Sequence, residues 1–92
     1  MKKLAPCLIG SVLLVAAGQA GATGLATCES GDQSSWKSEE ALKKQLTAKG
    51  WRVRRIKIDG GCYEVYAIND KGDRVESYFH PVTFKHILTS TR

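Results

Sequence analysis

Two cysteines and two histidines are the side chains of this sequence best suited to covalent or metal chemistry. Cys28 and Cys62 lie on either side of a basic, partly apolar stretch, and His80 and His86 lie near the C-terminus. The third cysteine, Cys7, lies in an N-terminal segment that we expect to be removed. The two that remain are an even number in a small exported domain, which predicts a disulfide. Two alternatives stay open, namely two free thiols or a metal site that adds His80 and His86. The sequence has no CxxC or HxxxH spacing, which disfavours the metal site.

The N-terminus has the pattern of a secretory signal peptide. A positive start, Met1 to Lys3, precedes the apolar run Leu4 to Ala17 and several small residues. We therefore expect a signal peptide at 1–22, a flexible arm rich in Gly, Ser and Thr at 23–35, and a domain at 36–92. Export would place the protein in the periplasm or outside the cell, with no stable membrane insertion after cleavage. The alternatives are an uncleaved anchor and a lipoprotein acylated at Cys28.

Length and charge limit the possible functions. The chain has 92 residues, with 14 Lys and Arg against 9 Asp and Glu. About 70 residues after cleavage would form one small domain, near the size at which a covalent cross-link contributes much of the stability. We expect no deep cleft, no catalytic residue, no cofactor and no metal, and hence no enzyme. The net positive charge favours an acidic partner. It is too small and too evenly mixed with acidic residues to indicate nucleic-acid binding.

The remaining pattern predicts an α+β fold. Ser38 can cap a helix that ends at Lys49 and Gly50 and buries Leu42 and Leu46. Strands are expected at 51–58, 62–69 and 73–79, joined by a two-residue Gly-Gly turn and a three-residue loop. One helix would thus pack on a three-stranded antiparallel meander (αβββ). Residues 84–88 could add a short strand or a helical turn.

Loop lengths predict the strand register and both faces of the sheet. The first and third strands should both be edges. Trp51 and Val53 have the opposite parity to Ile56 and Ile58, so either a bulge near Arg54 and Arg55 redirects the side chains, or Trp51 and Val53 cover the other face of the sheet. The helix should cover one face, made of Ile56, Ile58, Tyr63, Val65, Ala67, Val75 and Phe79. The other face should be solvated, and it comprises Glu64, Tyr66, Ile68, Arg74, Glu76 and Tyr78.

The stretch from Trp36 to Thr83 resembles a PepSY domain of the short, exported, single-domain kind. The resemblance is carried by the Gly50-Trp51 pair, the GCYEV strand from Gly61, the turn from Asn69 to Gly72 and the closing HPVTF. PepSY domains occur in propeptides of thermolysin-like proteases and in exported bacterial proteins. The resemblance therefore implies a non-enzymatic protein-binding module that regulates or inhibits peptidases. It carries over no catalytic residue, and a small periplasmic ligand- or metal-binding accessory protein is the alternative.

The closing turn departs from the DPxTG pattern of the family. His80 replaces the Asp and Phe84 replaces the Gly. Because glycine serves positive φ at such positions, Phe84 predicts a different turn here.

Partner contacts are expected from aromatic and arginine side chains, which are enriched at interfaces. The candidates are Trp51, Arg52, Arg54, Tyr66 and Tyr78. Trp51 could equally be buried against the helix end. The basic strand of Arg52, Arg54, Arg55 and Lys57 has two explanations: an acidic partner or anionic membrane surface, or an edge strand protected from aggregation by charge.

Overall fold

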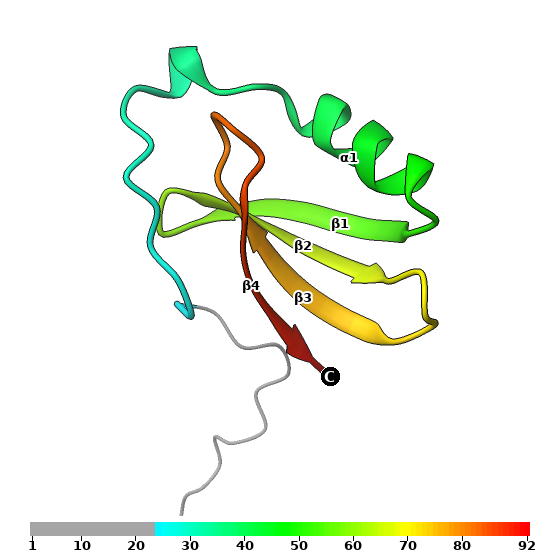
Figure 1. Cartoon of the computed structure of the whole chain (residues 1–92). Coiled ribbons are helices and arrows are strands. Elements are labelled where there is room, and N and C mark those ends of the chain that lie inside the picture. Colours follow the sequence, from blue (N-terminus) through cyan, green and yellow to red (C-terminus); the bar gives the residue numbers. More distant parts are fainter. Residues whose placement is uncertain (1–23) are drawn as a thin grey trace, which may run out of the picture.

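A computed structural model of the chain describes residues 24–92, so the expected signal peptide lies outside the described residues. A short 3₁₀ turn η1 (Gln33–Ser35) and the helix α1 (Glu39–Ala48) precede four strands. The strands are β1 (Arg52–Asp59), β2 (Cys62–Ile68), β3 (Arg74–Phe79) and β4 (His86–Thr91). They form one antiparallel sheet in the order β1-β2-β3-β4 (Figure 1). In the described part, no helix is long and apolar enough to cross a membrane.

Helix α1 begins and ends where its capping residues predict. The Ser38 side chain accepts a hydrogen bond from the Ala41 amide at 3.0 Å, and this satisfies one of the free amides of the first turn. At the other end, the Trp51 amide donates to the Leu46 carbonyl and Gly50 adopts a φ of 91°. These features are the Schellman motif, in which a left-handed glycine stops the helix. The helix therefore delivers the chain directly into β1.

Both hairpins have the predicted turns and register. Gly60 and Gly61 have φ values of 62° and 80°, so both central positions of the first turn need glycine. In the second hairpin, Gly72 has a φ of 87° and the predicted pairs form, including Ala67 with Val75 and Tyr63 with Phe79. A β-bulge interrupts the β1–β2 register between Val53 and Arg55, which confirms the bulge expected there.

The sheet has four strands rather than three, so the expectation that β3 is an edge was wrong. Strand β4 pairs antiparallel with β3, placing Leu88 opposite Tyr78. The edges are β1 and β4. Residues 84–88 were expected to add either a short strand or a helical turn. The strand continues through the polar segment His86 to Thr91, which has no clear alternation of apolar and polar residues. The turn between His80 and Lys85 reverses the chain and brings this segment alongside β3.

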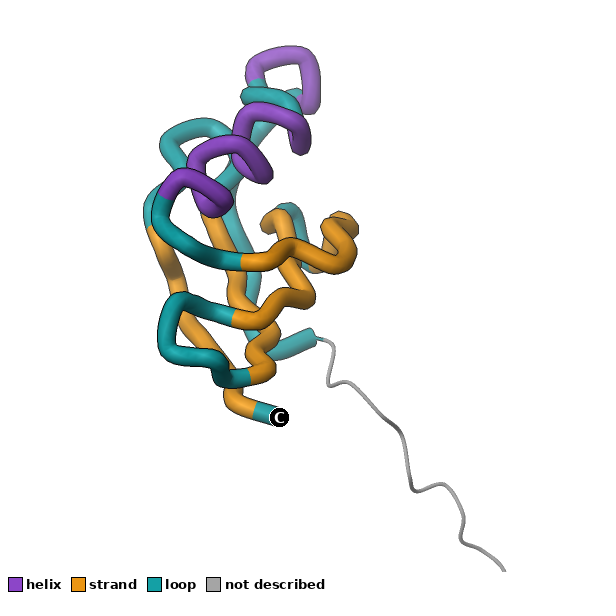
Figure 2. The backbone as a smooth tube through the Cα atoms, turned by 90° about the vertical axis from the view of Figure 1, so that its right-hand side faces the viewer, coloured by secondary structure: helices purple, strands orange, loops and turns teal. Residues whose placement is uncertain are grey.

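The main core lies between α1 and one face of the sheet (Figure 2). It contains Leu42, Leu46, Tyr63, Val65, Ala67, Val75, Phe79 and Phe84. Ile58 was expected in this core but is 46% exposed. The ten-residue α1 is only about 15 Å long at 1.5 Å per residue, whereas the eight residues of β1 span about 26 Å. Because the end of α1 leads directly into the start of β1, Ile58 at the far end of β1 lies beyond the reach of the helix.

The face opposite α1 was expected to be solvated, and half of it is not: Tyr66 and Ile68 are half-buried and Arg74 is exposed, but the other three residues are covered. Glu64, Glu76 and Tyr78 are each at most 1% exposed. Cys28 and Ala26 of the N-terminal arm pack against Tyr78 on this face, and Leu88 of β4 joins them. Loop lengths and side-chain alternation within the two hairpins do not predict where the arm and β4 lie, because both reach this face from distant parts of the sequence.

Phe84 was expected to indicate a different turn from the one glycine allows, and this expectation was wrong. Phe84 itself adopts the positive φ for which glycine is suited. Its φ is 65°, its ring is buried in the main core, and the Lys37 ammonium lies 4.9 Å from the ring centroid. Its amide donates to the His80 carbonyl at 2.7 Å. Burial of the ring thus offsets a backbone conformation that costs an L-residue roughly 1–2 kcal/mol.

This balance predicts an unusual order of stability for two Phe84 variants. Phe84→Ala should cost about 3–5 kcal/mol, the usual loss for a buried phenylalanine. Phe84→Gly should be no less stable than Phe84→Ala, because it relieves strain of about 1 kcal/mol. Urea unfolding of both variants measures the difference. A glycine variant clearly less stable than the alanine variant would show that the turn is not strained.

Candidate functional site

All arginines of the chain gather at one end of the sheet. Arg52, Arg54 and Arg55 begin β1, Arg74 begins β3, and Arg92 follows β4. Because neighbouring strands are antiparallel, these positions meet at the same end. The pairing shows it directly, since the Arg92 amide donates to the Arg74 carbonyl at 2.9 Å. We call this region the arginine end of the sheet.

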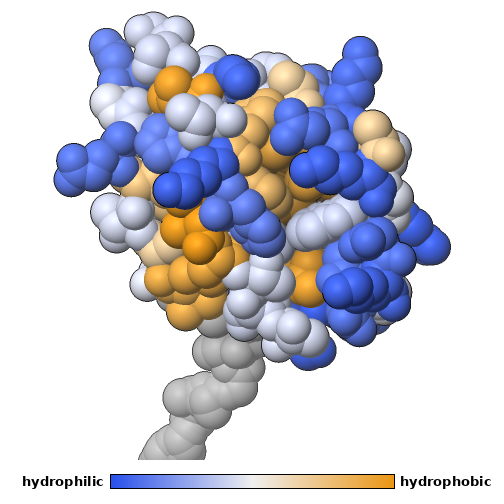
Figure 3. All heavy atoms as spheres, viewed as in Figure 1, coloured by the Kyte–Doolittle hydropathy of each residue, from blue (hydrophilic) through white to orange (hydrophobic). Residues whose placement is uncertain are grey.

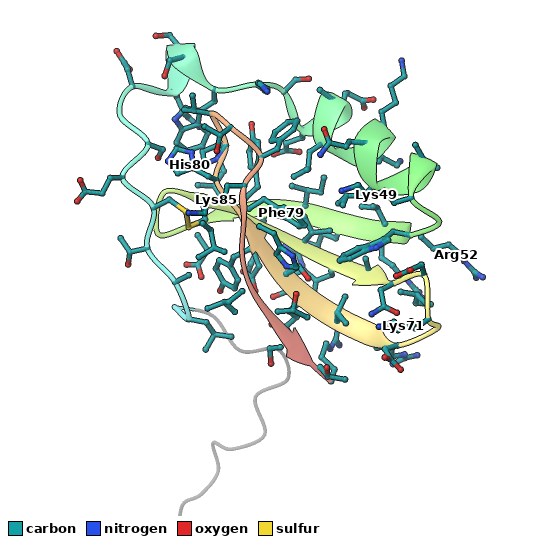
Figure 4. The ribbon with its side chains drawn as sticks, viewed as in Figure 1. Lys49, Arg52, Lys71, Phe79, His80 and Lys85 are labelled. Carbon is teal, nitrogen blue, oxygen red and sulfur yellow. A yellow bond between two sulfur atoms is a disulfide. The ribbon has the colours of Figure 1, made fainter. Side chains whose placement is uncertain are left out.

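Figure 4 shows that lysines extend this basic region. Lys49 after α1 and Lys71 in the β2–β3 loop lie on the same side of the view as Arg52, whereas His80 and Lys85 lie on the opposite side. Hydrophilic side chains crowd the same side of the space-filling view in Figure 3. The lysines are otherwise spread over the domain, so the concentration is specific to arginine.

The bulge in β1 determines which side chains face each other at this end. It lets Val53 pack against the main core while Arg55 and Lys57 lie beside Tyr66 on the opposite face. In a regular strand without the bulge, Val53 and Arg55 would share a face, since side chains alternate and the two are two residues apart. The bulge thus allows a basic strand to contribute to the core as well.

Tyr66 forms the centre of a group of cations. The distances to its ring centroid are 6.0 Å from Arg55 Cζ, 5.6 Å from Lys57 Nζ and 5.4 Å from Arg92 Cζ. Cations at this range are attracted to the face of an aromatic ring. The ring therefore holds three positive side chains from β1 and the end of β4 over one face of the sheet.

A small cavity of about 170 Å³ opens beside this group. Its lining comprises Arg54, Tyr66, Ala67, Ile68, Arg74 and Arg92. Arg54 and Arg74 are exposed, and neither forms an ion pair with another of residues 24–92. We call this cavity the arginine pocket.

Two buried carboxylates lie on the same face as Tyr66. Lys57 Nζ is 3.8 Å from Glu64, and Arg92 Nε is 3.4 Å from Glu76. Among the described residues, neither Glu64 oxygen has a hydrogen-bond partner, and the same holds for Glu76 Oε1. Burial raises the pKa of Glu64, and the nearby Lys57 offsets this only in part. The two buried carboxylates therefore attract cations to this face, although burying them costs free energy of folding.

At the other end of this face, the arm is held by several contacts. Cys28 and Cys62 form the expected disulfide, with Cα atoms 5.1 Å apart. The Cys28 amide donates to the Gly60 carbonyl at 2.8 Å, and the Ser30 hydroxyl donates to the Gly61 carbonyl at 2.7 Å. A Cβ at either glycine would lie 2.5 Å from a carbonyl oxygen of the arm. The Gly-Gly turn thus serves both the hairpin and the close approach of the arm.

Asp59 links the arm to Tyr78. Its Oδ2 accepts hydrogen bonds from the Gly24 amide and the Tyr78 hydroxyl, both at 2.7 Å. These two bonds lower the pKa of Asp59. Burial, together with the bond to Asp59, raises the pKa of Tyr78. Tyr78 is therefore a buried, neutral hydrogen-bond donor at neutral pH.

The structure separates the five residues expected to contact a partner. Arg54 and Tyr66 share the arginine pocket, and Arg52 is exposed nearby at the start of β1. Trp51 lies on the α1 side, where its ring meets Phe79 and His86 edge-on at 6.2 and 6.4 Å. Tyr78 is fully buried beneath the arm, so it offers no surface to a partner, contrary to expectation.

The two histidines are engaged separately. His80 bonds to the Val82 amide through Nδ1 and lies 3.2 Å from the Glu29 carbonyl through Nε2. His86 stacks on Phe79 and lies 2.6 Å from the Thr89 hydroxyl. Within residues 24–92, no three His, Cys, Asp or Glu side chains are grouped as metal ligands.

Sequence reasoning missed four participants of the site. Glu64 and Glu76 were placed on the correct face but interpreted as solvated. Arg74 was correctly expected to be exposed on that face but was given no role, and Arg92 was not singled out. One signal was present in the sequence: all five arginines fall at strand positions that an antiparallel sheet brings to one end. Recognising it required β4, which the sequence offered only as one of two alternatives for residues 84–88.

The fold and this surface define a class of protein: a small, disulfide-linked α+β domain with one helix on a four-stranded antiparallel sheet and a basic, aromatic contact surface. The family described as "Peptidase propeptide and YPEB domain" matches residues 7–89. The chain therefore belongs to the PepSY domain family, which confirms the resemblance. No curated protein and no solved structure matches it.

Proposed function

We propose that this protein is an exported, non-enzymatic PepSY module that binds a protein partner and regulates or inhibits a peptidase. Membership of the PepSY family over residues 7–89 is the observation that carries this proposal. The family name refers to peptidase propeptides, and a propeptide acts by contact with its protease. The surface offered by the arginine end suits such contact, because arginine and aromatic residues are enriched at interfaces.

Export, cleavage near residue 22 and residence in the periplasm or outside the cell are parts of the same proposal. The Cys28–Cys62 disulfide supports them, because disulfides persist in oxidising compartments and are rare in the cytosol. The disulfide also uses the thiol that a lipoprotein would acylate. Mass spectrometry of the mature protein identifies its first residue and any acyl group.

Capture of a partner tests the proposal. Residues 24–92, immobilised with the disulfide intact, should retain a specific protein from a cell-envelope extract, saturably and in competition with free domain. The captured protein should include a peptidase whose turnover of a peptide substrate falls as the domain is added. Saturable capture of no protein between acidic and neutral pH would contradict the proposal. A captured partner without peptidase activity would limit it to protein binding.

A further inference from the structure

We infer that the arginine pocket binds the carboxylate side chain of an acidic segment in a partner protein. This inference rests on the proposed function, since it names the chemistry by which the module would recognise its partner. The residues that carry it are Arg54, Arg74 and Arg92 around Tyr66. They come from β1, β3 and the end of β4, so only the folded sheet brings them together.

The chemistry of the lining selects a carboxylate. A guanidinium presents a planar fork of donors that matches the two oxygens of a carboxylate, and arginine is preferred to lysine for such recognition. Arg54 and Arg74 make no ion pair within the described part of the chain, so their charges are available to a ligand. Arg92 is held in place by Glu76 at 3.4 Å and by the Tyr66 ring.

The size of the pocket selects a side chain rather than a larger ligand. Its volume of about 170 Å³ is below the roughly 300–1,000 Å³ of typical small-molecule sites. Tyr66, Ala67 and Ile68 supply apolar surface among the guanidinium groups. Such a lining fits the methylenes and the carboxylate of a glutamate. Lys57 and Arg55 add positive charge next to the pocket, which should steer an acidic segment toward it.

The acidic side chains nearby do not cancel the positive potential around the pocket. Glu64 and Glu76 are buried beneath the cations, and each lies beside one of them, Lys57 or Arg92. The acids of the β2–β3 loop, Asp70 and Asp73, do not line the pocket. Of the five basic side chains on this part of the surface, Lys57 and Arg92 face these carboxylates, and three remain without an ion pair among residues 24–92: Arg54, Arg55 and Arg74.

Titration with a defined peptide tests the inference. The probe is a ten-residue peptide in which Glu alternates with Gly and Ala, and its counterpart carries Gln at every Glu. We expect chemical shifts of Tyr66, Ile68 and Arg74 amides to move with the Glu peptide only, and affinity to fall steeply with salt. The double variant Arg54→Gln/Arg74→Gln should weaken binding at least tenfold.

A matched control separates the pocket from general charge attraction. Lys44→Gln/Lys85→Gln removes the same charge at exposed positions that do not line the pocket, and it should change affinity less than twofold. Equal losses in the two double variants would overturn the inference. So would arginine-dependent binding to anionic lipid vesicles without peptide binding. Thermal unfolding of each variant confirms that it is folded.

The partner capture described above distinguishes this inference from the proposed function. If Arg54→Gln/Arg74→Gln still retains the partner as wild type does, the module binds a protein elsewhere and the pocket assignment fails alone. If wild type binds the Glu peptide but captures no protein, the pocket stands and the proposed function fails. Loss of capture in the arginine variant, with retention in the lysine variant, supports both.

Discussion

Replacing both Cys28 and Cys62 by serine should lower the free energy of unfolding by about 2–4 kcal/mol. The disulfide closes a loop across 34 positions that contains α1 and β1, so its loss greatly increases the freedom of the unfolded chain. For a domain of this size, such a loss is a large share of the total stability. The hydrophobic core beneath α1 does not include the disulfide, so the sheet should still form.

The effect should be concentrated in the arm. Without the disulfide, the arm is held over Tyr78 only by noncovalent contacts, namely hydrogen bonds such as that from the amide of residue 28 to Gly60 and the packing of Ala26. Limited proteolysis should then cut between residue 24 and Trp36, whose indole donates to the Ser30 carbonyl at 3.1 Å. Wild type treated with reductant should match the double variant in melting temperature. The double variant itself should not respond to reductant, which is the control.

Unchanged melting on reduction would contradict this prediction, as would two reactive thiols in the native protein before reduction. Complete unfolding at room temperature would show instead that the arm is part of the cooperative core. The two outcomes are distinguished by far-ultraviolet circular dichroism, which reports whether the helix and sheet remain.

Local signals made much of the fold predictable from the sequence. Ser38, the Schellman glycine Gly50 and the Gly60-Gly61 turn act within a few residues, so their geometry follows from residue type. The register of β2 and β3 followed from the three-residue loop closed by Gly72. The bulge at Arg54 was one of two explanations for the parity of β1, and the structure selects it, because Val53 and Ile56 both pack against the main core.

What failed depends on contacts between distant segments. Strand β4 is rich in Ser and Thr, and its pairing with β3 depends on a turn in which Phe84 adopts a left-handed conformation. The burial of Glu64 and Glu76 depends on neighbouring strands and long basic side chains above them. Arg54 and Tyr66 were predicted as contact residues, and the β2–β3 register placed Arg74 opposite Ile68. Arg92 was not predicted, because it joins the pocket only through β4.

The buried Glu64 carboxylate predicts a substitution that stabilises the protein. Glu64→Gln should raise the free energy of unfolding at pH 7 by about 1 kcal/mol, because a neutral amide costs less to bury than a charged carboxylate. It also loses the 3.8 Å ion pair with Lys57, but that ammonium is 32% exposed and such pairs contribute only about 0–1 kcal/mol. Relief from desolvation should therefore exceed the lost attraction.

The same residue gives the wild type a characteristic dependence on pH. Because the folded pKa of Glu64 is raised, the folded state binds a proton more tightly than the unfolded state does. Its contribution to stability is fully present below the ordinary carboxyl pKa and is lost as pH rises through the raised folded value. Asp59 acts in the opposite sense, because its folded pKa is lowered and its contribution is lost as pH falls through that value.

Urea unfolding from pH 2 to pH 8 measures both effects. In Glu64→Gln, the decline of stability toward neutral pH should be smaller than in wild type, and the loss in acid due to Asp59 should remain. Glu29→Gln removes the same charge from an exposed side chain and should leave the wild-type profile almost unchanged. A Glu64→Gln variant that is less stable than wild type at pH 7 would show that Lys57 compensates the buried charge in full. Because stabilisation without a new contact requires relief of desolvation, the sign of this single substitution decides whether the carboxylate is a strained or a satisfied part of the basic face.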